Sequence, residues 1–354
     1  MVRGAAVVKE VVFAVPGDLG TPTGGYTYDR RIVAELPALG WQPEVINLGE
    51  GFPCPTAHTR ASACARLSAL PHGRPLVIDG LAFGALPDAA QGLRARHPLV
   101  ALVHHPLALE SGLGAAGSAA LRASERAALG CARHVVATSA EVARLLMDDY
   151  GVAPDGMSVV QPGTDRVPAR PRNENSVVRL LAVGSLIPRK GYDVLVAALA
   201  RLTHLPWRLT VVGDCGRSPQ TARQVRADIA RFALADRIAL LGTVGAGELA
   251  PLYASADLFV LPSRFEGYGM AYAEALAYGV PVVGTTAGAI PATVPANAGV
   301  LVPPDDVEAL AAALQRLIAH AGERDRLAAC ARAAAFPSWR EQGMLFARVL
   351  DRLA

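Results

Sequence analysis

Short, continuous runs of apolar and mostly β-branched residues recur along the chain, each followed by a stretch with helical character. The first run is Val11–Val15. A strand with one wet face would alternate apolar and polar residues, whereas unbroken runs are typical of parallel strands covered by helices on both faces. Further runs of this kind are Val45–Ile46, Leu76–Ile78, Leu99–Val103 and His134–Ala137. The pattern therefore predicts an α/β protein with a doubly wound parallel sheet.

The series of runs then starts again, which predicts a second sheet. Its members are Val177–Val183, Leu209–Val212, Ile238–Leu241, Leu258–Leu261 and Val280–Val283. Helices are predicted for Ala115–Leu129, Asp193–Leu202, Ala271–Tyr278 and Ala309–Ala335. Residues 162–173 are rich in turn formers and lack apolar periodicity, so they are predicted to link two domains. A length of 354 residues fits two domains.

Composition and charge exclude several classes of protein. With 52% hydrophobic and 18% charged residues the chain is not intrinsically disordered, and a net charge of +3 does not indicate a nucleic-acid binder. Its five cysteines form no C-x-x-C pair, so neither a disulfide framework nor a zinc cage is expected. Neither a signal peptide nor a membrane span is predicted, which favours a cytoplasmic protein. A peripheral membrane contact and the oligomeric state stay open.

Ligands of doubly wound sheets bind beyond the carboxyl ends of the strands, so the residues there are the candidates for a site. Residues 16–25 follow the first strand and end in Gly24 and Gly25. Their backbone N–H groups could approach an anion, although ordinary turn glycines explain them equally well. His104 and His105 end the fourth strand, and because adjacent side chains point to opposite sides, at most one is expected to line a site. No carboxylate stands nearby at metal-ligand spacing, so no metal is predicted.

The second series carries stronger signals. Gly184 and Ser185 follow its first strand, and Arg189 and Lys190 come just before a helix. A diphosphate needs such a place, because arginine chelates two oxygens and lysine supplies a compact charge. Gly213 makes a further, weakly specific glycine turn after the next strand.

Residues 261–283 are the most informative stretch. Glu266 lies in a glycine-flanked loop after a strand, and Glu274 is expected about two turns into the following helix. Gly267 and Gly269 would expose backbone N–H groups at the start of that helix, which suits an anion or a sugar oxygen. The carboxylates could accept hydrogen bonds from sugar or ribose hydroxyls.

At these residues the sequence resembles glycosyltransferase family 4, the retaining nucleotide-sugar transferases. The resemblance rests on the E-x7-E element from Glu266 to Glu274 and on further elements in matching order across nearly the whole chain. These are Gly24-Gly25, His104, residues 162–165, Gly184-Ser185, residues 189–191 and residues 256–263. It implies a GT-B fold, in which two Rossmann-like doubly wound domains face a central cleft. The implied divisions are 1–165 for the acceptor, 166–335 for the nucleotide sugar, and 336–354 as a helix that crosses back to the first domain.

The resemblance also implies a role for each matching residue. Arg189 and Lys190 would hold the donor diphosphate and stabilise the leaving nucleotide. Glu266 would lie near the donor sugar, as would His104, and these four are the implied catalytic residues. Implied donor-binding residues are Gly24, Gly25, Gly184, Ser185, Gly213, Val244, Gly267, Tyr268, Gly269, Met270 and, for the ribose, Glu274.

Two features bear on how the donor is held. The family's Gly-Gly-x-Pro-Glu element is Gly288-Ala289-Ile290-Pro291-Ala292 here, so its glutamate is missing. No D-x-D motif is present, which fits a site that uses neither metal nor cofactor and leaves Arg189 and Lys190 to do the electrostatic work.

The sequence thus predicts a retaining, metal-independent glycosyltransferase (a hexosyltransferase). A sugar would move from a nucleotide-diphosphate sugar, with a UDP-sugar favoured and GDP-mannose next, to a hydroxyl of a small-molecule, glycan or lipid-linked acceptor. An NAD-dependent oxidoreductase is the first alternative, but it requires a G-x-G-x-x-G turn that the chain does not show convincingly. An inactive sugar-nucleotide-binding protein is the second, and it would be favoured by loss of Arg189, Lys190 or Glu266, all of which are present.

Overall fold

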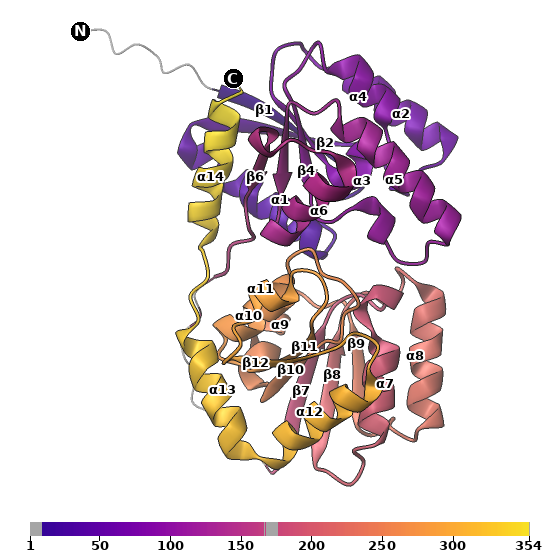
Figure 1. Ribbon diagram of the computed structural model, residues 1–354, viewed down its shortest axis with the longest axis vertical. Coiled ribbons are helices and arrows are strands. Elements are labelled where there is room, and N and C mark those ends of the chain that lie inside the picture. Colours follow the sequence, from indigo (N-terminus) through magenta and orange to yellow (C-terminus); the bar gives the residue numbers. More distant parts are fainter. Residues whose placement is uncertain (1–8, 166, 168–175, 354) are drawn as a thin grey trace, which may run out of the picture. The chain divides into compact units, whose positions relative to one another are not determined.

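A computed structural model describes residues 9–165, 167 and 176–353. The chain divides into two compact units, each drawn in Figure 1. Unit 1 combines residues 1–163 with residues 337–354, and unit 2 spans residues 164–336. Most of the predicted linker, 162–173, lies outside the described residues. The two units are described separately below.

Unit 1 is built on a six-stranded sheet in the order β2-β1-β3-β4-β5-β6, in which every neighbouring pair is parallel. Its strands are β1 (Lys9–Val15), β2 (Trp41–Asn47), β3 (Leu76–Asp79), β4 (Leu99–Val103), β5 (His134–Ala137) and β6 (Met157–Val159). Its helices are α1 (Gly24–Glu35), α2 (Ala57–Ser68), α3 (Gly80–Phe83), α4 (Pro87–Leu93), α5 (Ala115–Leu129), α6 (Ala140–Tyr150) and α14 (Trp339–Asp351). Residues 11–15 of β1 and all of β4 are buried, as their unbroken apolar runs predict.

The last helix of the chain completes unit 1. Helix α14 packs against α1 (Figure 1), and a side-chain carbon at Gly343 would lie 2.6 Å from Cβ of Glu35, so the two helices approach closely. The ring of Phe346 lies 5.7 Å from that of Phe13 on β1, and the ring of Trp339 lies 6.0 Å from that of Tyr28 on α1. Residues more than 300 positions apart in the sequence therefore share one core.

Unit 2 repeats the architecture with a sheet in the order β12-β11-β10-β7-β8-β9, again with parallel neighbours throughout. Its strands are β7 (Val178–Val183), β8 (Trp207–Val212), β9 (Ile238–Gly242), β10 (Leu258–Val260), β11 (Val282–Thr285) and β12 (Gly299–Val302). Its helices are α7 (Tyr192–Ala200), α8 (Pro219–Arg231), α9 (Ala246–Ser255), α10 (Met270–Ala277), α11 (Ile290–Thr293), α12 (Val307–Ala319) and α13 (Ala321–Ala333). Two six-stranded parallel sheets with flanking helices confirm the predicted α/β class.

Some sequence expectations were wrong in detail. Residues 309–335 form two helices, because the backbone leaves the helical region at His320 between α12 and α13. Strands β6 and β12 were not predicted: β6 is a three-residue edge strand with a central Ser158, and β12 is a four-residue edge strand that begins with Gly299. Both lack the long buried run that identifies the inner strands.

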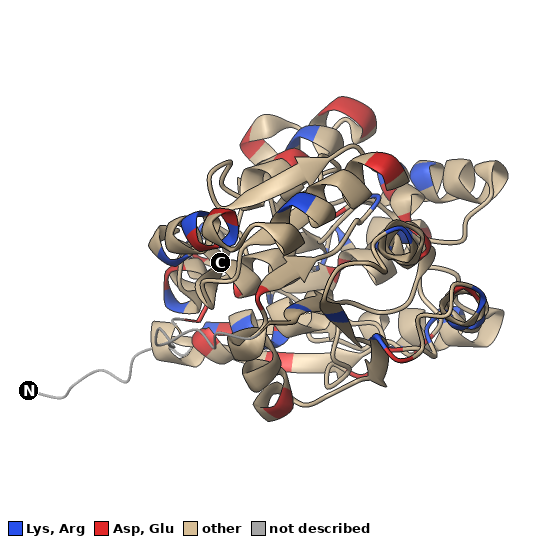
Figure 2. Cartoon of the chain, turned by 90° about the horizontal axis from the view of Figure 1, so that it is seen from below, with Lys and Arg blue, Asp and Glu red and all other residues tan. Residues whose placement is uncertain are grey.

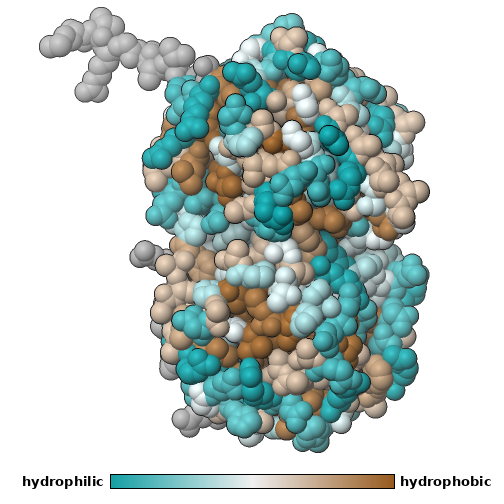
Figure 3. Space-filling view, viewed as in Figure 1, coloured by the Kyte–Doolittle hydropathy of each residue, from teal (hydrophilic) through white to brown (hydrophobic). Residues whose placement is uncertain are grey.

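The charges and hydrophobic groups of the surface are mixed. Figure 2 shows basic and acidic residues interspersed over the helices in view, in keeping with a net charge of only +3. On the face shown in Figure 3, hydrophilic and hydrophobic residues are likewise interspersed. Within the described residues, no helix combines the length and apolar character that crossing a membrane requires.

Candidate active site

The predicted donor-binding residues of unit 2 lie on loops at one edge of its sheet. Because all neighbouring strands are parallel, the loops that follow their carboxyl ends meet at the same edge, which we call the carboxyl edge. Gly184 and Ser185 follow β7, Gly213 follows β8, Val244 follows β9 and residues 263–269 follow β10. The structure therefore brings the second-domain candidates to the same edge of the sheet.

The turn that carries the two cations is fixed by a glycine. Residues Pro188–Lys190 form a single 3-10 turn, and Gly191 follows with a φ of 68°, a left-handed conformation that favours glycine. A side-chain carbon at Gly191 would also lie 2.1 Å from the carbonyl oxygen of Pro262. We call residues 188–191 the cation turn. Only glycine at position 191 lets this turn pack directly against the loop after β10.

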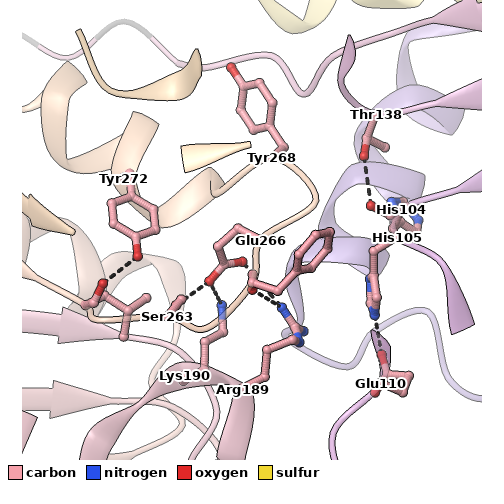
Figure 4. A network of polar contacts seen from close by, with 12 residues as sticks. His104, His105, Glu110, Thr138, Arg189, Lys190, Ser263, Glu266, Tyr268 and Tyr272 are labelled. Atoms are coloured by element: carbon pink, nitrogen blue, oxygen red, sulfur yellow. Dashed lines mark hydrogen bonds and ion pairs between the residues drawn. The ribbon is translucent and has the colours of Figure 1, made fainter. Parts of the chain in front are cut away.

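Arg189 and Lys190 converge on Glu266, as Figure 4 shows. Nζ of Lys190 donates to Oε1 of Glu266 at 2.6 Å, and the Ser263 hydroxyl donates to the same oxygen at 2.6 Å. Nη1 of Arg189 lies 3.5 Å from Oε2 of Glu266 and donates to the carbonyl oxygen of Phe265 at 3.0 Å. One carboxylate is thus held by two cations and a hydroxyl.

Burial and charge act together in this group. The side chains of Arg189, Lys190 and Glu266 are 14%, 15% and 8% exposed. Burial raises the pKa of Glu266, but the charges of Lys190 and Arg189 outweigh it and hold the pKa of this carboxyl below its usual value. Burial lowers the pKa of Lys190, and the Glu266 carboxylate offsets only part of that effect. With all three groups ionised, the cluster carries a net charge of +1.

The loop around Glu266 is held by neighbouring backbone and hydroxyl groups. The Thr285 hydroxyl donates to the carbonyl oxygen of Ser263 at 2.5 Å, and the Ala289 N–H donates to that of Glu266 at 2.9 Å. Gly288 has a φ of 55°, and a side-chain carbon there would lie 2.4 Å from the Glu266 carbonyl oxygen. The first half of the altered Gly-Gly-x-Pro-Glu element therefore supports Glu266 through its backbone.

Helix α10 begins directly after this loop and carries Glu274. Gly269, with a φ of 92°, precedes its first residue Met270, and no side chain caps this end of the helix. Glu274 is the fifth residue of α10, a little over one turn in, so the expected depth of about two turns was wrong, although the helix starts within one residue of the predicted Ala271. Its Oε2 accepts a hydrogen bond from the hydroxyl of Tyr253 at 2.9 Å.

Two glycines bring the ends of β7 and β8 together. A side-chain carbon at Gly213 would lie 2.0 Å from the carbonyl oxygen of Gly184, so the two backbones touch. One at Gly184 would lie 3.2 Å from Cε of Lys190, so the stem of this lysine crosses over Gly184. The Tyr192 hydroxyl donates to the Gly184 carbonyl oxygen at 2.6 Å. Val244 is half-buried and lies two residues after Gly242, the last residue of β9.

His104, a predicted site residue in unit 1, has acidic neighbours that the sequence did not predict. Nε2 of His104 lies 3.1 Å from Oδ1 of Asp29 on α1 and 3.4 Å from Oδ2 of Asp79 at the end of β3. The expectation that no carboxylate lies close by was therefore wrong, because the fold brings together residues that are 75 and 25 positions apart. His105 pairs separately with Glu110, so the adjacent histidines do have different surroundings.

The charges of His104 and Asp29 shift each other's pKa. Burial lowers the pKa of His104, but Asp29 and Asp79 outweigh it and raise it to about 10. Burial raises the pKa of Asp29 to about 6, although the imidazolium opposes this shift. One atom of each residue lies within 4.8 Å of the others, a spacing that an ion could also bridge. Nε2 of His104 lies at hydrogen-bonding distance from Oδ1 of Asp29, so we assign a proton to the contact between these two atoms.

The glycine loop of unit 1 approaches His104 as well. A side-chain carbon at Gly25 would lie 3.2 Å from Cδ2 of His104, and Gly24 is the first residue of α1. Arg30 holds the loop through hydrogen bonds to the carbonyl oxygen of Thr21 at 3.2 Å and the hydroxyl of Thr27 at 2.9 Å. The Gly24–Gly25 turn therefore lies beside the histidine at the end of β4.

Sequence reasoning missed several residues of these clusters. They are Asp29, Asp79, Ser263, Tyr253 and Arg264. Two signals were present: Asp79 ends a buried strand next to the strand of His104, and Asp29 stands in the apolar stripe of α1 formed by Tyr28, Ile32 and Leu36. A charge within such a stripe indicates a buried partner.

Comparisons with known proteins agree with these features. Residues 178–320 match the family model "Glycosyl transferases group 1", and residues 77–167 match "Glycosyltransferase Family 4". The predicted resemblance is thereby confirmed, and the chain is related to the glycosyltransferases of these groups.

Curated relatives include an MMP alpha-(1->4)-mannosyltransferase of Mycolicibacterium hassiacum, 31% identical over 70% of this chain and 62% of the relative. A D-inositol 3-phosphate glycosyltransferase of Geodermatophilus obscurus is 38% identical over 59% of this chain and 50% of the relative. The chain thus spans about half to three fifths of the length of these relatives.

Solved structures share the fold over nearly the full length. The sucrose-phosphate synthase of Thermosynechococcus elongatus has a TM-score of 0.80 at 22% identity and covers 97% of this chain and 98% of its own. HepE of Anabaena, solved with UDP and glucose, has a TM-score of 0.75 at 19% identity and covers 98% and 100%. The fold is therefore the predicted GT-B fold.

Proposed function

We propose that this protein is a glycosyltransferase that moves a sugar from a nucleotide-diphosphate sugar to an acceptor hydroxyl. The observation that carries the proposal is the cluster of Arg189 and Lys190 around Glu266 at the carboxyl edge of unit 2. Two largely buried cations beyond the carboxyl ends of parallel strands suit a ligand with two neighbouring phosphates. The family matches and the activities named for the curated relatives support the same class of reaction.

In the proposed reaction, the bond between the anomeric carbon and the diphosphate oxygen breaks through an oxocarbenium-like state. Negative charge then grows on the leaving diphosphate, where Arg189 and Lys190 stabilise it. The acceptor hydroxyl oxygen forms the new bond to the anomeric carbon, and its proton passes to the oxygen of the departing diphosphate. Attack from the face that the leaving group vacates would retain the anomeric configuration.

We further propose that the charge on the diphosphate is met by these side chains and by the uncapped start of α10, without a required metal ion. Arg189 and Lys190 carry two positive charges, and Glu266 neutralises one of them before the donor arrives. The surplus of +1 at the site and the N–H groups of α10 both favour an anion.

For the donor, we propose a UDP-sugar first and GDP-mannose second. HepE, which shares the fold, was also solved with UDP-glucose, and one curated relative is named a mannosyltransferase. We place the ribose near Glu274, whose carboxylate is fixed by Tyr253. The acceptor class stays a hydroxyl of a small molecule, glycan or lipid-linked sugar.

The test is a panel of nucleotide sugars with product mass as readout. UDP-glucose, UDP-galactose, UDP-N-acetylglucosamine, GDP-mannose and ADP-glucose are incubated with the protein, with and without EDTA, and free nucleotide and transferred sugar are measured. Thermal stabilisation by UDP, GDP, ADP and NAD runs in parallel. Release of UDP or GDP that survives EDTA supports the proposal, and strict dependence on added magnesium contradicts metal independence.

The parallel binding assay separates the two alternatives. Stabilisation by NAD alone would favour an oxidoreductase. Stabilisation by UDP with no turnover of any donor, with water or with added acceptors, would indicate a binding protein without activity.

A further inference from the structure

Asp29 is a buried carboxylate that the stability of the fold does not explain. It lies in the middle of α1 and is 1% exposed. Its Oδ1 bonds to Nε2 of His104, whereas its Oδ2 is buried and has no hydrogen-bond partner among the described residues. A buried carboxylate oxygen without a partner lowers stability. A residue kept at such a cost is a candidate for function.

The geometry fixes which nitrogen of His104 is engaged. Nε2 faces two carboxylate oxygens, Oδ1 of Asp29 at 3.1 Å and Oδ2 of Asp79 at 3.4 Å. Ionised carboxylates only accept hydrogen bonds, so Nε2 must carry a hydrogen. All hydrogen bonds and ion pairs that the structure gives the ring fall on Nε2, and the side chain is 17% exposed. Nδ1 is therefore the ring nitrogen left for a ligand.

The rest of the surroundings holds the ring in place. The rings of Tyr28 and His104 make a T-shaped contact with centroids 5.3 Å apart, and Gly25 leaves room for Cδ2 of His104. The Thr138 hydroxyl donates to the backbone oxygen of His104 at 3.1 Å. The titratable groups that face the ring are Asp29 and Tyr28 from α1 and Asp79 from β3. Neither Tyr28 nor Thr138 bonds to a ring nitrogen.

We infer that Asp29 is a positioning residue for the transfer reaction, which together with Asp79 clamps Nε2–H of His104 so that Nδ1–H is presented to an oxygen of a substrate. The inference rests on the proposed function. The two carboxylates differ in what else holds them. Oδ1 of Asp79 also accepts the backbone N–H of Leu81 at 2.8 Å, as the cap of α3, whereas the side-chain contacts of Asp29 stay within the cluster, with His104 and Asp79. Asp29 can therefore be changed while Asp79 still holds the histidine.

The test is Asp29→Asn, which keeps the shape of the side chain and removes its charge. We expect kcat to fall about tenfold or more, the scale seen when an outer partner of a functional histidine is lost, with little change in the donor KM. The melting temperature should change little, because Asp79 still pairs with His104 and leaves no uncompensated buried cation. Asp228→Asn is the matched control, since Asp228 is a buried carboxylate on α8 that pairs with Gln224 and Arg231.

A second readout needs no substrate. In protein labelled with ¹⁵N-histidine, both ring nitrogens of His104 should stay protonated to a higher pH than those of an exposed histidine, with assignment by His104→Gln. Asp29→Asn should bring this titration to lower pH, and Asp228→Asn should leave it unchanged.

The outcomes separate failure of the inference from failure of the proposed function. If the wild type transfers no sugar from any donor, the proposed function fails. If the wild type is active and Asp29→Asn matches it in kcat and in the His104 titration, the inference is overturned. A fall in melting temperature that parallels the loss of activity would make Asp29 merely structural. Absorption bands of bound Co²⁺ that Asp29→Asn abolishes would make the cluster a metal site instead.

Discussion

Nζ of Lys190 lies 2.6 Å from Oε1 of Glu266, in a place where both side chains are largely buried. The ammonium group is therefore already paired before any donor binds. A buried ion pair of this kind stabilises little by itself, but it removes the penalty of keeping a lone cation out of water. A bound diphosphate and Glu266 would both pair with the ammonium group of Lys190, which has an anionic partner before and after the diphosphate binds.

Arg189→Ala should abolish most of the activity and leave the fold intact. Loss of one well-placed electrostatic donor typically lowers the rate by ~10²–10³. Nucleotide release from the best donor of the panel measures the effect, and circular dichroism checks the fold. Arg208→Ala serves as control, because Arg208 is exposed on β8 at the other end of the sheet. Wild-type turnover in Arg189→Ala would refute the assigned role.

Glu266→Gln should separate binding from turnover. Removing the carboxylate raises the net charge of the cluster from +1 to +2, so UDP should bind at least as tightly as to the wild type. Turnover should fall by ~10², because Lys190 loses the partner that orients it. Calorimetry with UDP and steady-state rates measure the two effects. Weaker UDP binding together with normal kcat would contradict this account of the pair.

Arg264→Lys should weaken donor binding by loosening the cation turn. Nη1 and Nη2 of Arg264 bond to the two carboxylate oxygens of Asp193 at 3.1 and 2.7 Å, and its backbone N–H donates to the Arg189 carbonyl oxygen at 2.7 Å. Lysine cannot form the two-pronged contact. We expect the donor KM to rise about fivefold with kcat nearly unchanged, since partly exposed pairs contribute about 1 kcal/mol.

The control for this prediction is Arg144→Lys. Arg264 bonds to two acidic residues, Asp193 and Asp305, and Arg144 likewise bonds to Glu141 and Asp148, but on the surface of α6. Equal donor KM values for both variants and the wild type would show that Arg264 does not support the cation turn.

Glu125→Gln should change how stability depends on pH. Burial raises the pKa of Glu125 to about 8, although the Leu107 N–H, which donates to Oε2 at 2.8 Å, opposes this shift. The folded protein therefore favours the protonated form, and the wild type loses stability as the pH rises from about 4.5 to 8. Glutamine cannot ionise, so the variant should be more stable by about 1–3 kcal/mol at pH 9 and nearly equal at pH 4.

Urea unfolding at pH 4, 7 and 9 measures this difference, with Glu141→Gln on the surface of α6 as control. A constant difference at all three values would rule out titration of Glu125 as its cause.

The sequence predicted that the candidate residues of unit 2 lie together, because local signals coincide there. Gly184, Lys190 and Glu266 all follow buried apolar runs, and parallel strands bring such loops to one edge without further information. Strand ends and loop residues were therefore predictable from the pattern alone. Breaks within helical stretches were harder to predict, as the interruption at His320 between α12 and α13 shows, because the apolar residues continue on both sides of it.

The clamp on His104 was not predictable in the same way. Its partners come from a helix and a strand that lie 75 and 25 positions earlier, and only the order β1-β3-β4 in the sheet brings them together. Asp79 could have been found from its place at the end of a buried strand. Asp29 required knowing which side of α1 faces the sheet, and Arg264 required knowing which loops touch. Such contacts depend on tertiary packing and not on local pattern.

The return of α14 to unit 1 has a consequence for synthesis. Phe346 and Trp339 complete a core that begins with Phe13, so the earliest part of the chain must wait for residues near 351 to be translated. Unit 2 is contiguous and is complete by residue 336, before α14 has been translated. During translation on the ribosome, the middle of this polypeptide should therefore reach its native state before the beginning does, the reverse of the usual N-terminal-first order.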